Sequence, residues 1–215
     1  IIDAWKPDLL YTSDDDAQEF VAHHYLNQKM PIVFSGVNKE PREHGFDAAA
    51  NVTGVLEKEH FVESVKLLQS LEPRIRRLAV ISDNGIQWPP VIARIRAAMD
   101  RLPGVTLAAV DQVKTFDEFK EKLGAYPAVA DAVVQLGIFN LAGRDGRNVR
   151  YQEVQKWAAI NGSLPDTSFW IDRVHFGVLA SVTISEREQG LAAGRLAQAI
   201  LLEGRTPGSL PMRPT

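Results

Sequence analysis

The stretch Pro31-Ile-Val-Phe-Ser-Gly-Val-Asn38 decides the fold of this chain. It is an apolar run that ends in small and polar residues. This pattern is typical of a buried strand in a parallel sheet that delivers a loop to the carboxyl edge of the sheet. The segment Asn51-Val-Thr-Gly-Val55 has the same character. Because open α/β sheets bind ligands at that edge, the loops after the strands are the first candidates for a functional site.

The rest of the chain alternates short apolar runs with amphipathic segments. The runs predict strands over 8–13, 31–37, 51–55, 77–82, 105–110, 130–136, 168–171 and 178–184. Helical periodicity predicts helices over 17–28, 57–71, 115–123, 148–160 and 188–202, with one more after Pro89 and Pro90. Such alternation predicts parallel sheets with helices on both faces and right-handed crossovers. A loop-rich stretch over 38–51 separates a first group of units from a second, which favours two sheets over one.

Composition excludes several classes of protein. The 24 basic and 27 acidic residues give a net charge of -3, which offers no broad positive field for nucleic acid or anionic membrane. The absence of cysteine excludes a thiol nucleophile, a zinc-thiolate site and disulfides. No run of about 18 apolar residues is present. The chain begins at Ile1 without a basic and apolar leader, so any signal peptide is expected to be removed already or to lie outside this chain.

The catalytic motifs are weak, with one exception. No histidine follows a strand in a nucleophile elbow, and Gly143-Arg-Asp-Gly146 lacks the features of a phosphate-binding loop. The exception is Asp14-Asp-Asp16, which directly follows a predicted strand. Clustered carboxylates at such a position can hold Mg²⁺ for phosphoryl transfer, although a single aspartate there is also a good helix N-cap.

Four segments together resemble a known family. They are Asp8-Leu-Leu-Tyr-Thr-Ser-Asp-Asp-Asp-Ala17, the opening stretch 31–38, Asn51-Val-Thr-Gly-Val-Leu-Glu57 and Val178-Leu-Ala-Ser-Val-Thr-Ile184, the last followed by Glu188-Gln-Gly190. In this order they resemble the ABC transporter substrate-binding proteins of the periplasmic binding protein type I class, including the subgroup found as extracytoplasmic sensor domains. The resemblance covers essentially the whole chain.

The resemblance implies two Rossmann-like α/β lobes with parallel sheets, joined by hinge strands and closing over a small ligand. Residues 1–55 and 182–210 would form the first lobe, and 56–181 with 211–215 the second. The chain would cross between lobes at Asn51 to Val55, at Ala180 to Thr183 and near Pro211. Family members begin with further β-α units before the position of Ile1, so the first lobe is expected to be incomplete at its N-terminus.

The loops after successive parallel strands define the predicted ligand site. The first lobe would contribute Ser13, Asp14, Asp15, Ser35, Gly36 and Asn38. The second would contribute Asp83, Asn84, Gly137, Asn140, Trp170 and Asp172. These hydroxyls, amides and carboxylates with one aromatic wall suit a small polar molecule. Four of these residues are aspartates: Asp14, Asp15, Asp83 and Asp172. Their carboxylates suggest that the ligand carries an amine or another cationic group.

Two functions therefore stay open. The first is an extracytoplasmic, periplasmic solute-binding protein that captures an amino-acid-like ligand between its lobes for ABC transport or signalling, with no catalytic residue, metal or cofactor. Its partners would be the ligand and an ABC permease or a signalling domain, but neither nucleic acid nor a membrane span. The second is a carboxylate and Mg²⁺-dependent phosphoryl-transfer or hydrolase enzyme using Asp14 to Asp16.

Overall fold

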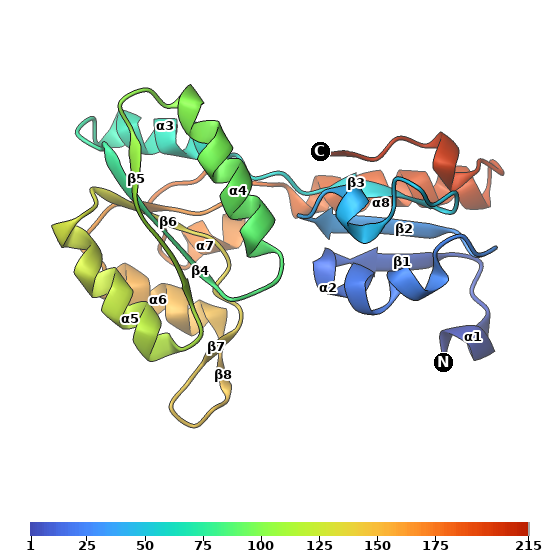
Figure 1. Ribbon diagram of the computed structural model, residues 1–215, viewed down its shortest axis with the longest axis horizontal. Helices are drawn as coiled ribbons and strands as arrows, with labels where there is room; N and C mark the ends of the chain where they lie inside the picture. The colour runs from blue at the N-terminus through green and yellow to red at the C-terminus, as the bar shows by residue number, and fades with distance from the viewer. Residues whose placement is uncertain (215) are drawn as a thin grey trace. The chain divides into compact units, whose positions relative to one another are not determined.

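The computed structural model describes residues 1–214 and divides the chain into two units (Figure 1). The first unit comprises Ile1–Lys58 and Ser185–Thr215, and the second comprises Glu59–Ile184. Each contains a four-stranded parallel sheet. The α/β class and the presence of two parallel sheets, both predicted from the strand and helix pattern, are confirmed.

The sheet of the first unit has the order β1-β2-β3-β10. Its strands are β1 (Leu10–Ser13), β2 (Ile32–Val37), β3 (Val52–Leu56) and β10 (Arg213–Pro214). Parallel pairing places Ser13 beside Ser35 at the carboxyl ends of β1 and β2. The opening stretch is thus the interior strand β2, as its apolar run predicts.

Helices and short helical turns cover both faces of this sheet. The helical elements of the unit are α2 (Asp14–Phe20), η1 (Ala22–Tyr25), η2 (Pro41–His44), α8 (Glu186–Leu201) and η5 (Pro207–Ser209), together with α1 (Ile2–Trp5), which has no buried residue. Ala193 of α8 packs against Val33 and Val55 on one face. On the other face, Phe34 packs against Phe46 with the rings tilted at a centroid distance of 5.2 Å. Figure 1 shows α8 along one side of β2 and β3, and α2 on the other side.

The sheet of the second unit has the order β5-β4-β6-β9. Its strands are β4 (Arg77–Asp83), β5 (Thr106–Val113), β6 (Ala132–Gln135) and β9 (Asp166–Thr167). A separate antiparallel hairpin joins β7 (Leu141–Ala142) to β8 (Asn148–Val149), so the first residues of the helix predicted over 148–160 form a strand instead. The central strands are almost entirely buried, which explains their continuous apolar runs.

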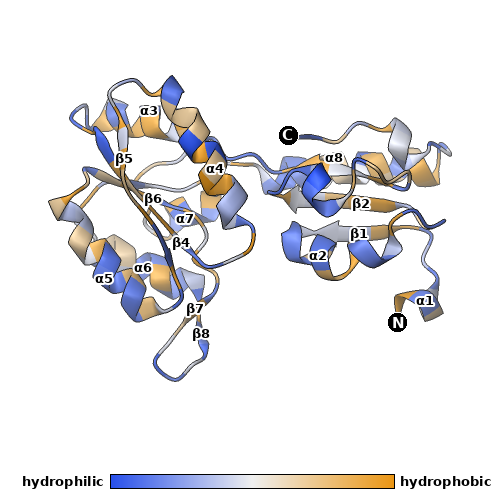
Figure 2. Cartoon of the chain, in the orientation of Figure 1, coloured by the Kyte–Doolittle hydropathy of each residue, from blue (hydrophilic) through white to orange (hydrophobic). Residues whose placement is uncertain are grey.

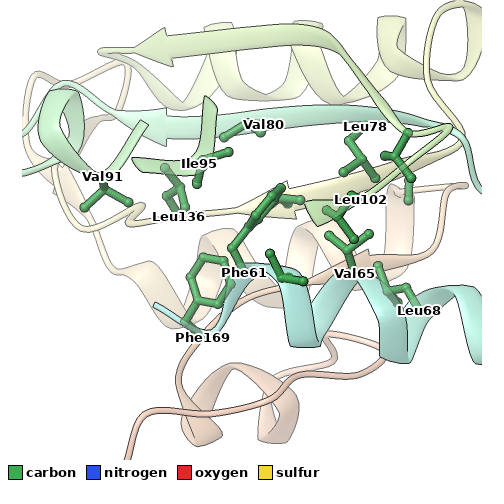
Figure 3. Close-up of a cluster of buried hydrophobic side chains, with 14 of the residues drawn as sticks. Phe61, Val65, Leu68, Leu78, Val80, Val91, Ile95, Leu102, Leu136 and Phe169 are labelled. Atoms are coloured by element: carbon green, nitrogen blue, oxygen red, sulfur yellow. The ribbon is translucent and has the colours of Figure 1, made fainter. Parts of the chain in front are cut away.

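Two hydrophobic clusters cover the two faces of this second sheet. The helical elements are α3 (Phe61–Leu71), α4 (Trp88–Ala98), η3 (Met99–Arg101), α5 (Phe116–Ala125), η4 (Tyr126–Ala128), α6 (Tyr151–Asn161) and α7 (Ile171–His175). Figure 3 shows Phe61, Val65 and Leu68 of α3 directed toward the strands on one face. Residues of α5 and α6 pack on the other face. Apolar and polar residues alternate along these helices in Figure 2, as two-faced helices require.

Local chemistry accounts for where the elements begin. Thr115 caps α5 through a reciprocal pair of hydrogen bonds with Glu118. At Gly54 in β3, a Cβ would lie 2.4 Å from the ring of Phe34, so only glycine lets that ring pack across the strand. Sequence therefore determines both the helix start and the packing of the opening strand.

Several other elements differ from expectation. Residues 168–171 and 178–184 do not form strands: β9 lies two residues earlier, α7 starts at Ile171, and Ile184 makes only an isolated bridge to Trp170. The predicted helix over 17–28 starts instead at Asp14 and is interrupted at Val21. The segment 211–214 was expected in the second lobe, but Arg213 pairs with Val55 in the first unit.

The expected hinge positions also differ from the observed division. The boundaries between the units fall at Lys58/Glu59 and Ile184/Ser185, so 51–55 lies wholly inside the first unit as β3. The segment near Pro211 is not a third crossing, because everything after Ser185 belongs to the first unit. Within residues 1–214 no helix has the length and apolar character needed to cross a bilayer.

Candidate functional site

The first unit gathers small and polar groups where β1 and β2 end. Gly36 has φ of 67°, a left-handed conformation that glycine adopts without strain. A Cβ at this position would lie 3.5 Å from Ser13 Oγ and 3.7 Å from the Asp14 nitrogen. Asp14 itself has φ of 70°. The C-terminal ends of β1 and β2 therefore lie in close contact, and each has a residue with positive φ beside it.

Helix α8 connects to this edge through Gln189. The Gly36 N–H donates to Gln189 Oε1 at 2.8 Å, and Gln189 Nε2 donates to Glu57 Oε2 at 3.2 Å. Both side chains are buried. The amide of Gln189 therefore joins the C-terminal end of β2 to the segment after β3. Sequence reasoning missed both residues as site components, although Glu57 and Gln189 belong to two of the segments that carry the resemblance.

The side chain of Asp15 fixes the loop that follows β2. Its carboxylate is fully buried and accepts hydrogen bonds from the backbone N–H groups of Asn38 at 3.0 Å and Lys39 at 3.1 Å. His44 Nε2 lies 2.8 Å from Asp15 Oδ1. The carboxylate of Asp15 thus organises the loop after β2 and is not exposed to solvent.

The hydroxyl of Ser35 is also engaged in a hydrogen bond within the protein. The hydroxyls of Tyr11 and Ser35 are hydrogen-bonded at 2.5 Å, and Ser35 is buried. Ser13 and Asp14 are exposed at the same edge, whereas Asn38 is buried. Of the six residues predicted in the first lobe, Ser13, Asp14 and the backbone of Gly36 are the most accessible to a solute.

In the second unit, Asp83 has the same organising function as Asp15. Its carboxylate is fully buried at the end of β4. Asp83 Oδ2 accepts from the N–H groups of Phe139 at 2.8 Å and Asn140 at 3.0 Å, while Oδ1 accepts from Gly85 N–H at 2.9 Å and Trp88 Nε1 at 2.5 Å. Four donors therefore fix the loops after β4 and β6 around one carboxylate.

Gly137 lies directly against the indole of Trp88. A Cβ built on Gly137 would come within 1.7 Å of Trp88 Cζ2, and the Gly137 carbonyl accepts from Asp83 N–H at 2.7 Å. Gly137 is therefore a packing position that lets the two loops approach each other.

Three aromatic rings surround the guanidinium of Arg173 near the carboxyl edge of the second sheet. Its guanidinium carbon lies 4.6 Å from the ring centroid of Phe139, 4.5 Å from that of Tyr151 and 5.7 Å from that of Trp170. Arg173 is 1% exposed, and Trp88 and Trp170 meet edge-on at 6.2 Å. Burial raises the pKa of the Tyr151 hydroxyl, and the neighbouring Asp172 carboxylate raises it further, as the smaller of the two causes. These cation–π contacts fasten α7 to the loop after β6.

The predicted residues of the second lobe divide into two groups by exposure. Asn84 and Asn140 are exposed and Asp172 is partly exposed, so their side chains are accessible to a solute. Asp83, Gly137 and Trp170 are buried and shape the edge from inside. Arg173, Tyr151 and Phe139 were not predicted as site residues. Arg173 lies two residues after the segment 168–171 that was predicted as a strand, and nothing in the sequence marks it as a buried arginine.

The three consecutive aspartates do not converge. Asp15 is buried against Asn38 and Lys39, whereas Asp14 and Asp16 are exposed. Within residues 1–214, no three His, Cys, Asp or Glu side chains are grouped as metal ligands would be.

Comparison with solved structures identifies the fold. A conserved domain protein from Vibrio cholerae matches with a TM-score of 0.78 at 18% identity, over 100% of this chain and 70% of its own. The ABC domain of Streptococcus pneumoniae in complex with L-Trp matches with a TM-score of 0.76 at 18% identity, over 99% and 70%. A ligand-free, open substrate-binding protein with adhesive properties from Clostridium difficile matches with a TM-score of 0.67 at 17% identity, over 98% and 69%.

No protein-family model and no curated protein matches the sequence. The structural likeness nonetheless confirms the fold implied by the sequence resemblance: the chain has the fold of ABC transporter substrate-binding proteins of the periplasmic binding protein type I class.

Proposed function

We propose that this chain is an extracytoplasmic solute-binding protein that serves an ABC transporter or a signalling protein. The observation that carries the proposal is the match of the whole chain to the fold of proteins of this class. Two of those neighbours are described by their function, one as a substrate-binding protein and one in complex with L-Trp. Residues at the carboxyl edges of the two sheets would hold the solute.

The ligand is proposed to be amino-acid-like, with an amine. Of the four aspartates that suggested a cationic ligand, Asp15 and Asp83 use their oxygens to fix loops. The charge selection then rests on Asp14 and Asp172, which keep solvent exposure although Asp14 Oδ1 accepts the Asp15 N–H at 2.7 Å and Asp172 Oδ1 lies 3.9 Å from Arg173 Nε. Asn84 and Asn140 would supply hydrogen bonds beside them, while Gly36, whose N–H is donated to Gln189, would leave space for the solute at the edge. The remaining predicted residues, Ser13, Ser35, Asn38, Gly137 and Trp170, would contribute to the shape and polarity of the two edges.

Calorimetry with the full chain tests the proposal. Amino acids are titrated in parallel with purely anionic solutes, and the variant Asp172→Asn is compared with Asp145→Asn, a carboxylate in an exposed turn of the same unit. We expect one amino acid class to bind with 1:1 stoichiometry and Asp172→Asn to weaken it about tenfold, since a lost charge contact is worth about 1.4 kcal/mol or more. Tight binding of an anion would refute the ligand class, and no binding of any solute would refute the function.

The second function, a Mg²⁺-dependent phosphoryl-transfer enzyme, is less well supported because Asp15 is turned inward to backbone N–H groups. Its test is separate. Mg²⁺-dependent phosphatase activity that is abolished by Asp14→Asn would replace the binding proposal by the enzymatic one.

A further inference from the structure

Large apolar side chains are exposed at the carboxyl edge of the second sheet. Ile86 follows β4, Phe139 follows β6 and Ile171 follows β9. Their exposed fractions are 41%, 36% and 50%. The three strands are consecutive in the sheet, so their loops are neighbours. A single exposed apolar side chain is ordinary, but three on adjacent loops leave an apolar surface in contact with water.

Contacts between the loops keep these three side chains in one region of the edge. The Asp83 carboxylate accepts the N–H of Phe139 at 2.8 Å and, at 2.9 Å, the N–H of the glycine that precedes Ile86. The ring centroids of Phe139 and Trp170 are 6.5 Å apart, and Ile171 is the next residue after Trp170. The loops after β4, β6 and β9 therefore present their apolar residues close to one another.

The ring of Phe139 is supported from the protein side. The guanidinium carbon of the buried Arg173 lies 4.6 Å from its centroid, and the ring of Tyr151 meets it edge-on at 5.4 Å. A ring held in this way is preorganised, so a solute that covers its exposed part loses little side-chain entropy. Phe139 thus offers the exposed aromatic surface that was expected of Trp170, which is only 9% exposed.

Each of these loops also presents a polar side chain within two positions of its apolar one. The polar residues are Asn84, Asn140 and Asp172. Two amides and one carboxylate beside an apolar surface fit a solute that has both an amine and an apolar body. A solute without an apolar body would leave this surface in water and would gain nothing from it.

We propose that the solute carries a large apolar side chain, and that Ile86, Phe139 and Ile171 determine this specificity. The inference rests on the proposed function and adds to it the class of side chain that the site accepts. The amine would face Asp172, and the apolar chain would cover the three exposed residues. Since the hydrophobic gain is proportional to the apolar area removed from water, affinity should increase with the length of the solute's side chain.

Calorimetry of the full chain with a homologous series tests the inference. The probes are L-alanine, L-2-aminobutanoate, L-norvaline and L-norleucine, which share the amine and carboxylate and differ stepwise by one methylene. We expect the dissociation constant to fall about twofold to fourfold with each methylene. Equal affinity along the series, tightest binding of L-alanine, or binding only of amino acids with polar side chains would overturn this inference and leave the proposed function standing. No binding of any solute would refute the proposed function itself.

Three variants and a control assign the specificity to these residues. Ile86→Ala, Ile171→Ala and Phe139→Leu each reduce the apolar surface, so each should weaken L-norleucine about fivefold and L-alanine much less. Ile160→Ala, an 81% exposed position on α6, is the matched control and should leave the whole series unchanged. If Phe139→Leu does not fold, the two isoleucine variants decide, because their side chains are about half exposed. An equal loss for L-alanine and L-norleucine, or no loss for either, overturns the proposal.

Discussion

At the scale of single residues, the two most buried predicted site carboxylates stabilise loops. Asp15 and Asp83 each accept several backbone N–H groups from a neighbouring loop. Such charge-assisted bonds are stronger than neutral ones and fix the loop geometry before any solute arrives. The sequence predicts that these aspartates lie at the edge, but not that they point inward.

Asp83→Asn is expected to destabilise the second unit. The amide nitrogen would face two N–H donors, so the bonds to Phe139 and Asn140, or those to Gly85 and Trp88, would be lost. We expect a loss of about 3 kcal/mol in the free energy of unfolding, measured by urea denaturation. Asp145→Asn, in an exposed turn, should change it by less than about 0.5 kcal/mol. Equal stability of the two variants would show that Asp83 does not organise the loops.

Gly137→Ala tests the close approach of Trp88. The added methyl would have to displace the indole, because its ideal position lies 1.7 Å from Trp88 Cζ2. Overpacking of this kind costs about 1–3 kcal/mol, and tryptophan fluorescence should shift as the ring moves. Gly124→Ala in α5 is the matched control: nothing lies within 4 Å of its Cβ, so alanine should stabilise the helix by about 0.5–1 kcal/mol. A stable Gly137→Ala with unchanged fluorescence would contradict this packing.

At the scale of elements, the pattern predicts the long helices and buried strands well and fails where tertiary contacts replace a sheet. The apolar run 178–184 has strand composition, yet the Val182 N–H donates to Ser64 Oγ of α3 at 3.0 Å. Only Ile184 pairs, with Trp170. Periodicity cannot distinguish a strand from an extended segment held by a helix side chain. The buried arginine at 173 lacks a sequence signal for the same reason: its partners Phe139 and Tyr151 come from the loop after β6 and from α6.

The contacts of Asp131 at the start of the second sheet predict how the stability of the fold changes at low pH. Asp131 accepts from the Arg76 and Arg77 backbone N–H groups and from the Arg77 side chain, which joins the beginnings of β4 and β6. The Arg77 side-chain bond, opposed by desolvation, lowers the pKa of Asp131 to about 2. Because the folded pKa lies below the unfolded value near 3.9, this stabilisation is present above about pH 4 and is lost as the pH falls toward 2.

Asp131→Asn should therefore flatten the fall in stability between about pH 5 and pH 2, measured by urea denaturation at each pH. Other carboxylates with lowered pKa, such as Glu72, keep part of the acid response in both proteins. The prediction concerns the difference between the two curves. Parallel curves over this range would mean that Asp131 has the same pKa in the folded and unfolded chain.

At the scale of the whole molecule, the two units differ in how the chain builds them. The second is one continuous segment, 59–184, with hydrophobic clusters on both faces of its sheet. The first depends on distant parts of the chain, because α8 supplies Ala193 against Val33 and β10 pairs with β3. Sequence alternation predicts the two sheets, but the return of the C-terminal segment to the first sheet is a long-range contact that no local pattern encodes.

The continuous unit should fold alone. We expect a fragment 59–184 to unfold cooperatively and to keep the near-UV signal of the Trp88 and Trp170 contact, since its sheet, both covering layers and the Asp83 bonds are internal. A fragment 1–58 should remain unfolded, because one face of β2 and β3 would lose α8 and expose Val33 and Val55. Joining 185–215 to it by a flexible linker should restore folding, measured by circular dichroism and amide dispersion. Cooperative folding of 1–58 by itself, or an unfolded 59–184, would show that the cores assigned to these units do not determine their stability.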